Sequence, residues 1–193
     1  MIPLRDDNPR RTFPFVTYLL VAMNVLAFVW ELSLGPQLDR ALFNIAFIPA
    51  RYWLPGNWLF DLLTIVISMF LHGGLMHIGS NMLYLWIFGD NIEDSMGHAR
   101  YFVFYLLCGT AAALAQGLLD PNSEIPMIGA SGAVSGILGA YILLHPGATV
   151  RTLIVLGFFV TMAYVPALLV LGIWFVGQLL SASMTPLGEP GIA

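Results

Sequence analysis

The hydrophobic residues of this chain fall into long continuous runs, separated by short clusters of polar residues, glycine and proline. Five such runs cover residues 13–34, 71–88, 101–119, 131–144 and 164–180. Because a helix needs about 20 apolar residues to cross a bilayer, the runs predict membrane-spanning helices. We therefore expect an all-α polytopic membrane protein, with residues 1–193 forming a single membrane domain.

Two stretches do not fit the pattern of a spanning helix. Residues 35–70 contain charged residues, prolines and many aromatic residues, and Tyr52 beside Arg51 is typical of the lipid headgroup level. This composition predicts a structured interfacial loop that lies in the membrane surface. A second interfacial segment, rich in β-branched and aromatic residues, is expected at residues 150–163, ahead of the last span.

The composition excludes a water-soluble globular domain. Hydrophobic residues make up 59% of the chain and charged residues 9%, whereas a soluble domain carries about 25% charged residues. The seven basic residues form no patch that would bind nucleic acid, so the lipid bilayer is the expected partner. Arg5, Arg10 and Arg11 precede the first run, which places the N-terminus in the cytoplasm by the positive-inside rule.

The first apolar run is expected to remain in the mature protein, because it is longer than a signal-peptide core and no small-residue cleavage site follows it. The single cysteine, Cys108, allows no internal disulfide and no thiolate metal cluster. His72 and His77 lack the carboxylate or third imidazole on the same face that a zinc site needs. Neither a metal nor a cofactor is expected.

The fourth run is too short to cross the membrane. Residues 131–144 form at most 14 helical residues, about 21 Å in length, against a hydrocarbon core of about 30 Å. Its N-terminus must begin below the membrane surface, where free N–H groups are tolerated only beside protein or water. The sequence therefore predicts a water-accessible cavity with Ser131 at its floor, near the positive end of a helix dipole.

The second run supplies polar groups that fit this cavity. His77 and Asn81 are four residues apart and share one helix face. Imidazole and carboxamide N–H groups are the donors that the oxyanion of an acyl-transfer intermediate requires. His72 falls on a different face near the end of the span, where we expect it to hold the interfacial loop.

Each of these residues also has a structural interpretation. Gly132 and Gly136 form a Gly-xxx-Gly pair, the pattern by which membrane helices pack closely. Ser135 and Gly139 fit the same packing role. His77 and Asn81 are equally compatible with ordinary hydrogen bonds between helices.

The combination of motifs is more specific than any single residue. The chain has His-x4-His-x3-Asn on the second span, followed about 50 residues later by Gly-Ala-Ser-Gly at the start of the short helix. Together with GDNIEDSMGHARYFVFYLLCG and PALLVLGIW, this pattern closely resembles bacterial members of the rhomboid family of intramembrane serine proteases. The resemblance covers nearly the whole chain.

This resemblance implies a catalytic or a supporting role for each matching residue. Ser131 matches the nucleophile, and its own N–H, with the side chains of His77 and Asn81, matches the oxyanion hole. Gly129 matches the first motif glycine, where a side chain would crowd the cavity, and Gly132 matches the glycine after the serine. His72 matches a histidine with a supporting role. In many relatives a tyrosine stands where this chain has Ser135.

The resemblance also implies a general base that this chain does not supply. The family uses a histidine on a sixth span, in an Ala-His-x-x-Gly setting. His98 lies in a loop and His145 lies 14 residues beyond Ser131, so neither reaches the serine. We therefore expect a truncated chain with five of the six core spans, inactive alone, from an enzyme that cleaves transmembrane protein substrates in a bacterial inner membrane.

Two other functions remain compatible with the sequence. A non-catalytic rhomboid-like protein would bind membrane helices without cutting them, and no Ala-His-x-x-Gly would follow in its reading frame. A channel or transporter component would use His77 and Asn81 to line a permeation path. In that protein His77→Ala would abolish ion flux and Ser131→Ala would be harmless.

Overall fold

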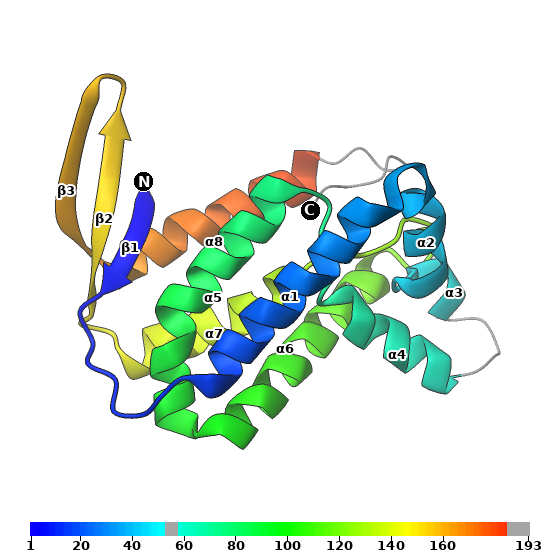
Figure 1. Cartoon of the computed structure of the whole chain (residues 1–193), viewed down its shortest axis with the longest axis horizontal. Coiled ribbons are helices and arrows are strands. Elements are labelled where there is room, and N and C mark those ends of the chain that lie inside the picture. The colour runs from blue at the N-terminus through cyan, green and yellow to red at the C-terminus, as the bar shows by residue number, and fades with distance from the viewer. Residues whose placement is uncertain (53–57, 185–193) are drawn as a thin grey trace.

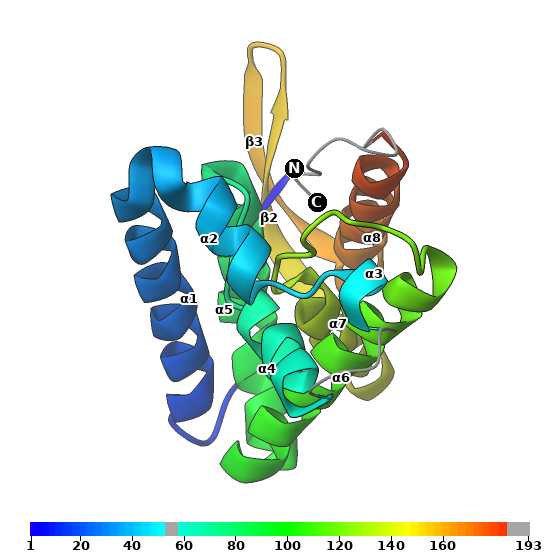
Figure 2. The same ribbon diagram turned by 90° about the vertical axis from the view of Figure 1, so that its right-hand side faces the viewer.

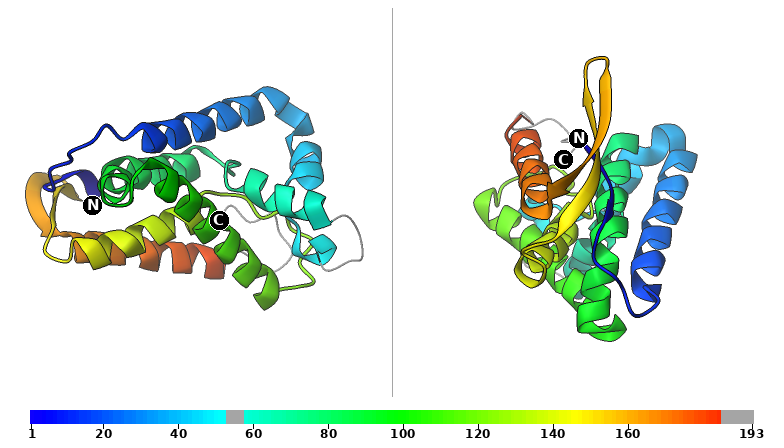
Figure 3. Two further views of the ribbon diagram at one scale, coloured as in Figure 1. Left: turned by 90° about the horizontal axis from the view of Figure 1, so that it is seen from below. Right: turned by 90° about the vertical axis from the view of Figure 1, so that its left-hand side faces the viewer.

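A computed structural model describes residues 1–52 and 58–184 of the chain. Within these residues, five long helices lie alongside one another (Figures 1 and 3): α1 (Phe15–Leu34), α5 (Leu75–Met96), α6 (His98–Leu119), α7 (Ser131–Leu144) and α8 (Ala167–Met184). In this part of the chain, the helical stretches Phe15–Ile45 and His98–Leu119 are long and apolar enough to cross a membrane. The predicted helical bundle is confirmed.

The structure adds a small antiparallel sheet at one end of the bundle (Figures 1 and 2). Strands β1 (Ile2–Asp6), β2 (Thr149–Leu156) and β3 (Phe159–Pro166) pair in the order β1-β2-β3. The segment predicted to be interfacial is thus the hairpin β2–β3. A two-residue turn at Gly157 and Phe158 closes it, and Gly157 has φ +58, which suits the first central position of a type II′ turn.

The two ends of the bundle carry different structures (Figure 1). We call the end with the sheet and with the α5–α6 turn at Gly97 the sheet end. The loop end, opposite to it, carries α2 (Leu38–Ile45), α3 (Pro49–Tyr52) and residues 120–130. Each long helix runs from one end toward the other, so residues at its two termini lie far apart.

The expected interfacial loop 35–70 folds into short helices: η1 (Gly35–Gln37), α2, α3 and α4 (Trp58–Ser68). Residues 53–57 of this loop lie outside the described residues. The second long helix begins at Leu75 rather than at residue 71 and continues to Met96. The preceding Gly73 and Gly74 account for the late start, because glycine disfavours the helical conformation.

Helix α7 packs against both α5 and α6, and it buries Ala133, Val134, Ile137, Leu138 and Tyr141. The contact with α6 is close because both helices present small residues. A Cβ atom added at Gly132 would lie 2.5 Å from the Cβ of Ala112, and one added at Gly136 would collide with Cys108. Gly132 and Gly136 therefore serve the packing role, whereas Gly139 faces open space.

Helix α1 is held to α5 by a carboxylate. Its N-cap residue, Pro14, offers no side-chain hydrogen bond. The fully buried Glu93 of α5 accepts instead from the N–H groups of Val16 (2.8 Å) and Thr17 (2.7 Å) and from the Thr17 hydroxyl. A negative charge at a helix N-terminus is favourable, so Glu93 fixes the sheet end of α1 in place.

Candidate active site around Ser131

Ser131 is the first residue of α7, and the backbone around it offers free donors. The N-cap residue Ala130 is fully buried and makes no side-chain cap. The first backbone hydrogen bond at this end runs from the N–H of Val134 to the carbonyl of Ala130, 2.9 Å away. The N–H groups of the first turn therefore point out of the helix with the positive end of its dipole.

The segment before α7 is fixed by contacts with residues far earlier in the chain. The N–H of Gly129 donates to the carbonyl of Ser68 (2.9 Å), and the N–H of Met127 donates to the carbonyl of Phe47 (2.8 Å). The Ser68 hydroxyl in turn accepts from the N–H of Phe47 (2.7 Å). Ser68 thus links α4, the interfacial loop and the start of α7.

His77 and Asn81 lie one turn apart on α5, and both are buried. The Asn81 amide donates to the His77 carbonyl (3.1 Å) and keeps a second hydrogen for another acceptor. Within the described part of the chain, neither ring nitrogen of His77 has a hydrogen-bond partner. Buried polar groups are normally hydrogen-bonded, so these nitrogens are available to a ligand or to water.

Gly129 shows how close His77 and Ser131 are to each other. A Cβ added there would lie 2.8 Å from Nε2 of His77 and 3.7 Å from Oγ of Ser131. The histidine ring and the serine hydroxyl therefore border the same space, and a methyl group at Gly129 would fill it. Gly129 also has φ +131, a conformation that other residues rarely adopt.

His72 lies in the turn before α5 rather than on the helix as expected. Its N–H donates to both carboxylate oxygens of Glu31 on α1, at 3.0 and 3.2 Å. Its ring packs edge-on against the His77 ring, with centroids 5.0 Å apart. His72 therefore connects α1 to the ring that faces Ser131.

Glu31 and Ser68 were not singled out from the sequence. Glu31 could have been found in the sequence, because burying a lone acidic side chain in an apolar span costs free energy and indicates a polar partner. Ser68 gave no such signal, since a serine near a helix end is common.

The other two histidines lie at the sheet end, away from Ser131. His98 begins α6, and its ring nitrogen contacts Glu93. His145 follows the last residue of α7 and donates its N–H to the Tyr141 carbonyl (2.8 Å). Ser135 uses its hydroxyl within α7, donating to the carbonyl of Ser131 (2.7 Å). Among the described residues, no group of three or more His, Cys, Asp and Glu side chains could hold a metal ion.

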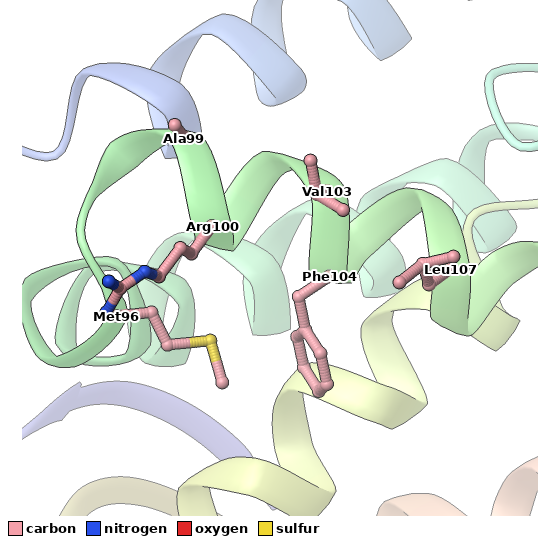
Figure 4. Close-up of a pocket in the computed structure, with 6 residues that line it drawn as sticks. All are labelled: Met96, Ala99, Arg100, Val103, Phe104 and Leu107. Carbon is pink, nitrogen blue, oxygen red and sulfur yellow. The ribbon is translucent and has the colours of Figure 1, made fainter.

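An open groove lies elsewhere on the described part of the protein (Figure 4). It has a volume of about 500 Å³, lies along the first half of α6 at the sheet end, and is lined by Met96, Ala99, Arg100, Val103, Phe104 and Leu107. None of these residues contacts the space between His77 and Ser131, so the groove is not part of the candidate active site.

A sequence model of the Rhomboid domain matches residues 59–191, which include His72, His77, Asn81 and Ser131. This chain belongs to the rhomboid family. Rhomboid proteins are integral membrane proteins, and the family includes intramembrane serine proteases. The helical bundle described above is therefore a rhomboid-like bundle.

Several curated rhomboids resemble the chain. Rhomboid protease GluP of Bacillus subtilis (strain 168) is 33% identical over 128 residues, which cover 66% of this chain and 24% of the relative. Rhomboid protein 1, mitochondrial, of Saccharomyces cerevisiae is 29% identical over 140 residues, 70% of this chain and 38% of the relative. Rhomboid protease AarA of Providencia stuartii is 26% identical over 144 residues, which cover 66% of this chain and 50% of the relative. The chain thus spans half or less of the length of these relatives.

Proposed function

We propose that this chain carries the nucleophile and oxyanion hole of an intramembrane serine protease. One observation carries the proposal: the Ser131 hydroxyl and the His77 ring border one space at the uncapped N-terminus of α7. In the proposed reaction, Ser131 Oγ attacks a substrate peptide carbonyl, the C–N bond breaks, and the amine leaves with the proton of the serine. Water then hydrolyses the acyl-enzyme, which releases the acid and returns a proton to Ser131.

The surrounding groups suit the negative charge that develops on the attacked carbonyl oxygen. The N–H of Ser131 lies at the positive end of the helix, and the His77 ring and the free hydrogen of the Asn81 amide are further donors. Removing one donor from an oxyanion hole lowers kcat by roughly 10²–10³. We therefore assign oxyanion stabilisation to these three groups and support to Gly129, Gly132 and His72.

The mechanism also needs a general base within hydrogen-bond reach of Ser131. His98 and His145 lie at the sheet end, and His77 is assigned to the oxyanion hole. We propose that the base is a histidine outside these 193 residues, so that the chain by itself is inactive.

The arginine distribution supports an orientation in the membrane. Arg5, Arg10, Arg11, Arg100 and Arg151 lie at the sheet end, and Arg40 and Arg51 belong to the loop 35–70. By the positive-inside rule, we place the sheet end and the N-terminus in the cytoplasm of a bacterial cell, with Ser131 toward the opposite side. Transmembrane protein segments are the proposed substrates.

A serine-directed fluorophosphonate tests the assignment. The probe would be added in detergent to the 193-residue chain and to the protein encoded by the full natural reading frame. The Ser131→Ala variant and the matched control Ser135→Ala would be made in the full protein. We expect labelling of the full reading frame and of Ser135→Ala, and loss of labelling in Ser131→Ala and in the 193-residue chain. Equal labelling of both serine variants would refute Ser131 as the nucleophile.

A second function is favoured by the absence of a base beside Ser131 among the described residues. A non-catalytic rhomboid-like protein would bind membrane helices in the same space without cutting them. Its full reading frame would contain no Ala-His-x-x-Gly, and it would capture a transmembrane peptide intact, with equal affinity in wild type and Ser131→Ala.

A further inference from the structure

The hairpin β2–β3 exposes apolar side chains that no other described element covers. Phe158 at the turn is 105% exposed, Phe159 81% and Val160 63%. No charged residue occurs from Thr152 to Pro166. In Figures 1 and 2 the hairpin projects from the bundle, in keeping with the exposure of these side chains. Exposed apolar patches of this kind mark an interaction site.

One face of the sheet changes from cationic to apolar along the hairpin. Opposite residues of antiparallel strands share a face, and the register places Arg5, Arg151 and Tyr164 in one row across the three strands. The next rows toward the turn on this face contain Leu153 with Met162 and Val155 with Val160. Arginine and tyrosine followed by aliphatic residues is the order found at a membrane surface, from headgroups to acyl chains.

The two arginines provide an independent argument for an anionic ligand. Arg5 and Arg151 are directly opposite each other, and both are exposed. Like charges in that position destabilise a sheet. The Arg151 guanidinium contacts Met162 Sδ (3.3 Å) rather than an acid. An anion that bridges the two guanidinium groups would remove the repulsion, and phosphate suits arginine especially well.

We propose that the hairpin β2–β3 is a lipid-binding element. The side chains of residues 155–162 insert into the leaflet on the sheet side as far as the boundary between headgroups and acyl chains, and Arg5 and Arg151 together bind the phosphate of an anionic phospholipid. The open edge of β3 limits the depth, because unpaired strand edges do not occur in the hydrocarbon core. The strands therefore lie no deeper than this boundary, where water and phosphate oxygens still reach the backbone groups of the edge.

A second copy of the chain explains the surface less well. A strand added at the edge of β3 would pair backbone groups but leave Phe158, Val155 and Val160 exposed, since these lie at the turn or on a face. A lipid leaflet can cover the turn and both faces together. The proposal does not depend on protease activity.

Insertion is tested with spin labels in vesicles of phosphatidylcholine and phosphatidylglycerol. In a Cys108→Ala background, labels at Phe158→Cys and at the exposed control Ser95→Cys are compared for accessibility to oxygen and to a water-soluble nickel complex. We expect oxygen access at residue 158 and nickel access at residue 95. Nickel access at residue 158 would overturn insertion, and spin–spin coupling between labels would assign the surface to a second copy instead.

Headgroup binding is tested by native mass spectrometry of the same chain. Loss of either arginine, in Arg5→Gln or in Arg151→Gln, should reduce the amount of phosphatidylglycerol that the protein retains by about fivefold. The control Arg40→Gln on α2 should retain as much lipid as the wild type. Unchanged retention in the double variant would overturn the phosphate site, even if residue 158 is inserted. Loss of protease activity plays no part in either readout.

Discussion

At the scale of single residues, the candidate site depends on the space between His77 and Ser131. Gly129 keeps that space open, since its missing side chain would contact the His77 ring. Its positive φ adds a second requirement for glycine. The site therefore depends on an absent methyl group as much as on the polar groups that surround it.

Gly129→Ala should abolish the reaction of Ser131 while the bundle stays folded. We expect fluorophosphonate labelling of the full reading frame to fall more than tenfold, because the new Cβ occupies the reacting space. Left-handed backbone strain should cost about 1–2 kcal/mol of stability. The matched control is Gly139→Ala, a helical glycine with open space around it, which should label normally and gain up to about 1 kcal/mol. Normal labelling of Gly129→Ala would contradict the geometry.

At the scale of elements, helix α7 connects packing to the site. Its start carries Ser131, and Gly132 one residue later lets α7 approach α6. A small shift of α7 away from α6 would therefore move the proposed nucleophile relative to His77 on α5.

The close approach of α7 and α6 can be tested by exchanging two side chains. Gly132→Ala places a Cβ against Ala112 and should cost about 1–3 kcal/mol through overpacking. Ala112→Gly removes the opposing Cβ and should cost about 1 kcal/mol through helix propensity. In the double variant the clash is gone, so detergent melting should show a smaller loss than the sum of the two. Strictly additive losses would mean that the two residues do not touch.

The sequence predicted some elements better than others, for physical reasons. The bounds of α7 were predicted correctly because Pro146 ends the apolar run close to the helix, and the preceding polar loop marks its start. The hairpin β2–β3 was expected only as an interfacial segment, because a short continuous apolar run such as Leu153–Leu156 has no periodicity that distinguishes a strand from a helix. Pairing with β1, far away in sequence, determines the sheet.

The candidate site also combines features that the sequence predicts with contacts that it does not. The spacing of His77 and Asn81 on one helix face follows from helical periodicity, so it was visible in the sequence. The contacts of Glu31 with His72 and of Ser68 with Gly129 join residues about 40 and 60 positions apart. No local pattern contains such pairs, and only the tertiary structure reveals them.

At the scale of the whole molecule, the N-terminal arm closes the sheet end. Strand β1 pairs with β2, and Asp7 accepts from the N–H (2.9 Å) and the hydroxyl (2.6 Å) of Thr149. On the other side of the arm, Thr12 donates to Asp94 at the end of α5. The arm thus joins the hairpin to the helices on which the site is built.

This closure should depend on pH. The Thr149 hydroxyl and N–H lower the pKa of Asp7 below its ordinary value of 3.8. A carboxyl group with a lowered pKa stabilises the folded state above its unfolded pKa, and this stabilisation is lost as pH falls through the folded pKa. Asp7→Asn should therefore melt earlier than wild type in detergent at pH 6, and the difference should shrink as the pH falls below 3.8 and through the lowered pKa of Asp7. A difference that persists unchanged at low pH would mean that the charge of Asp7 contributes nothing.

The contacts that fix the start of α7 also determine when it can form during synthesis. Gly129 and Met127 bind to Ser68 and Phe47, residues that leave the ribosome long before them. Contacts between residues so distant in sequence form late, because a long loop must close first. A growing chain that has inserted α1 through α6 therefore contains His77 and Asn81 but no ordered Ser131, and the candidate site is complete only after most of the bundle already lies in the membrane.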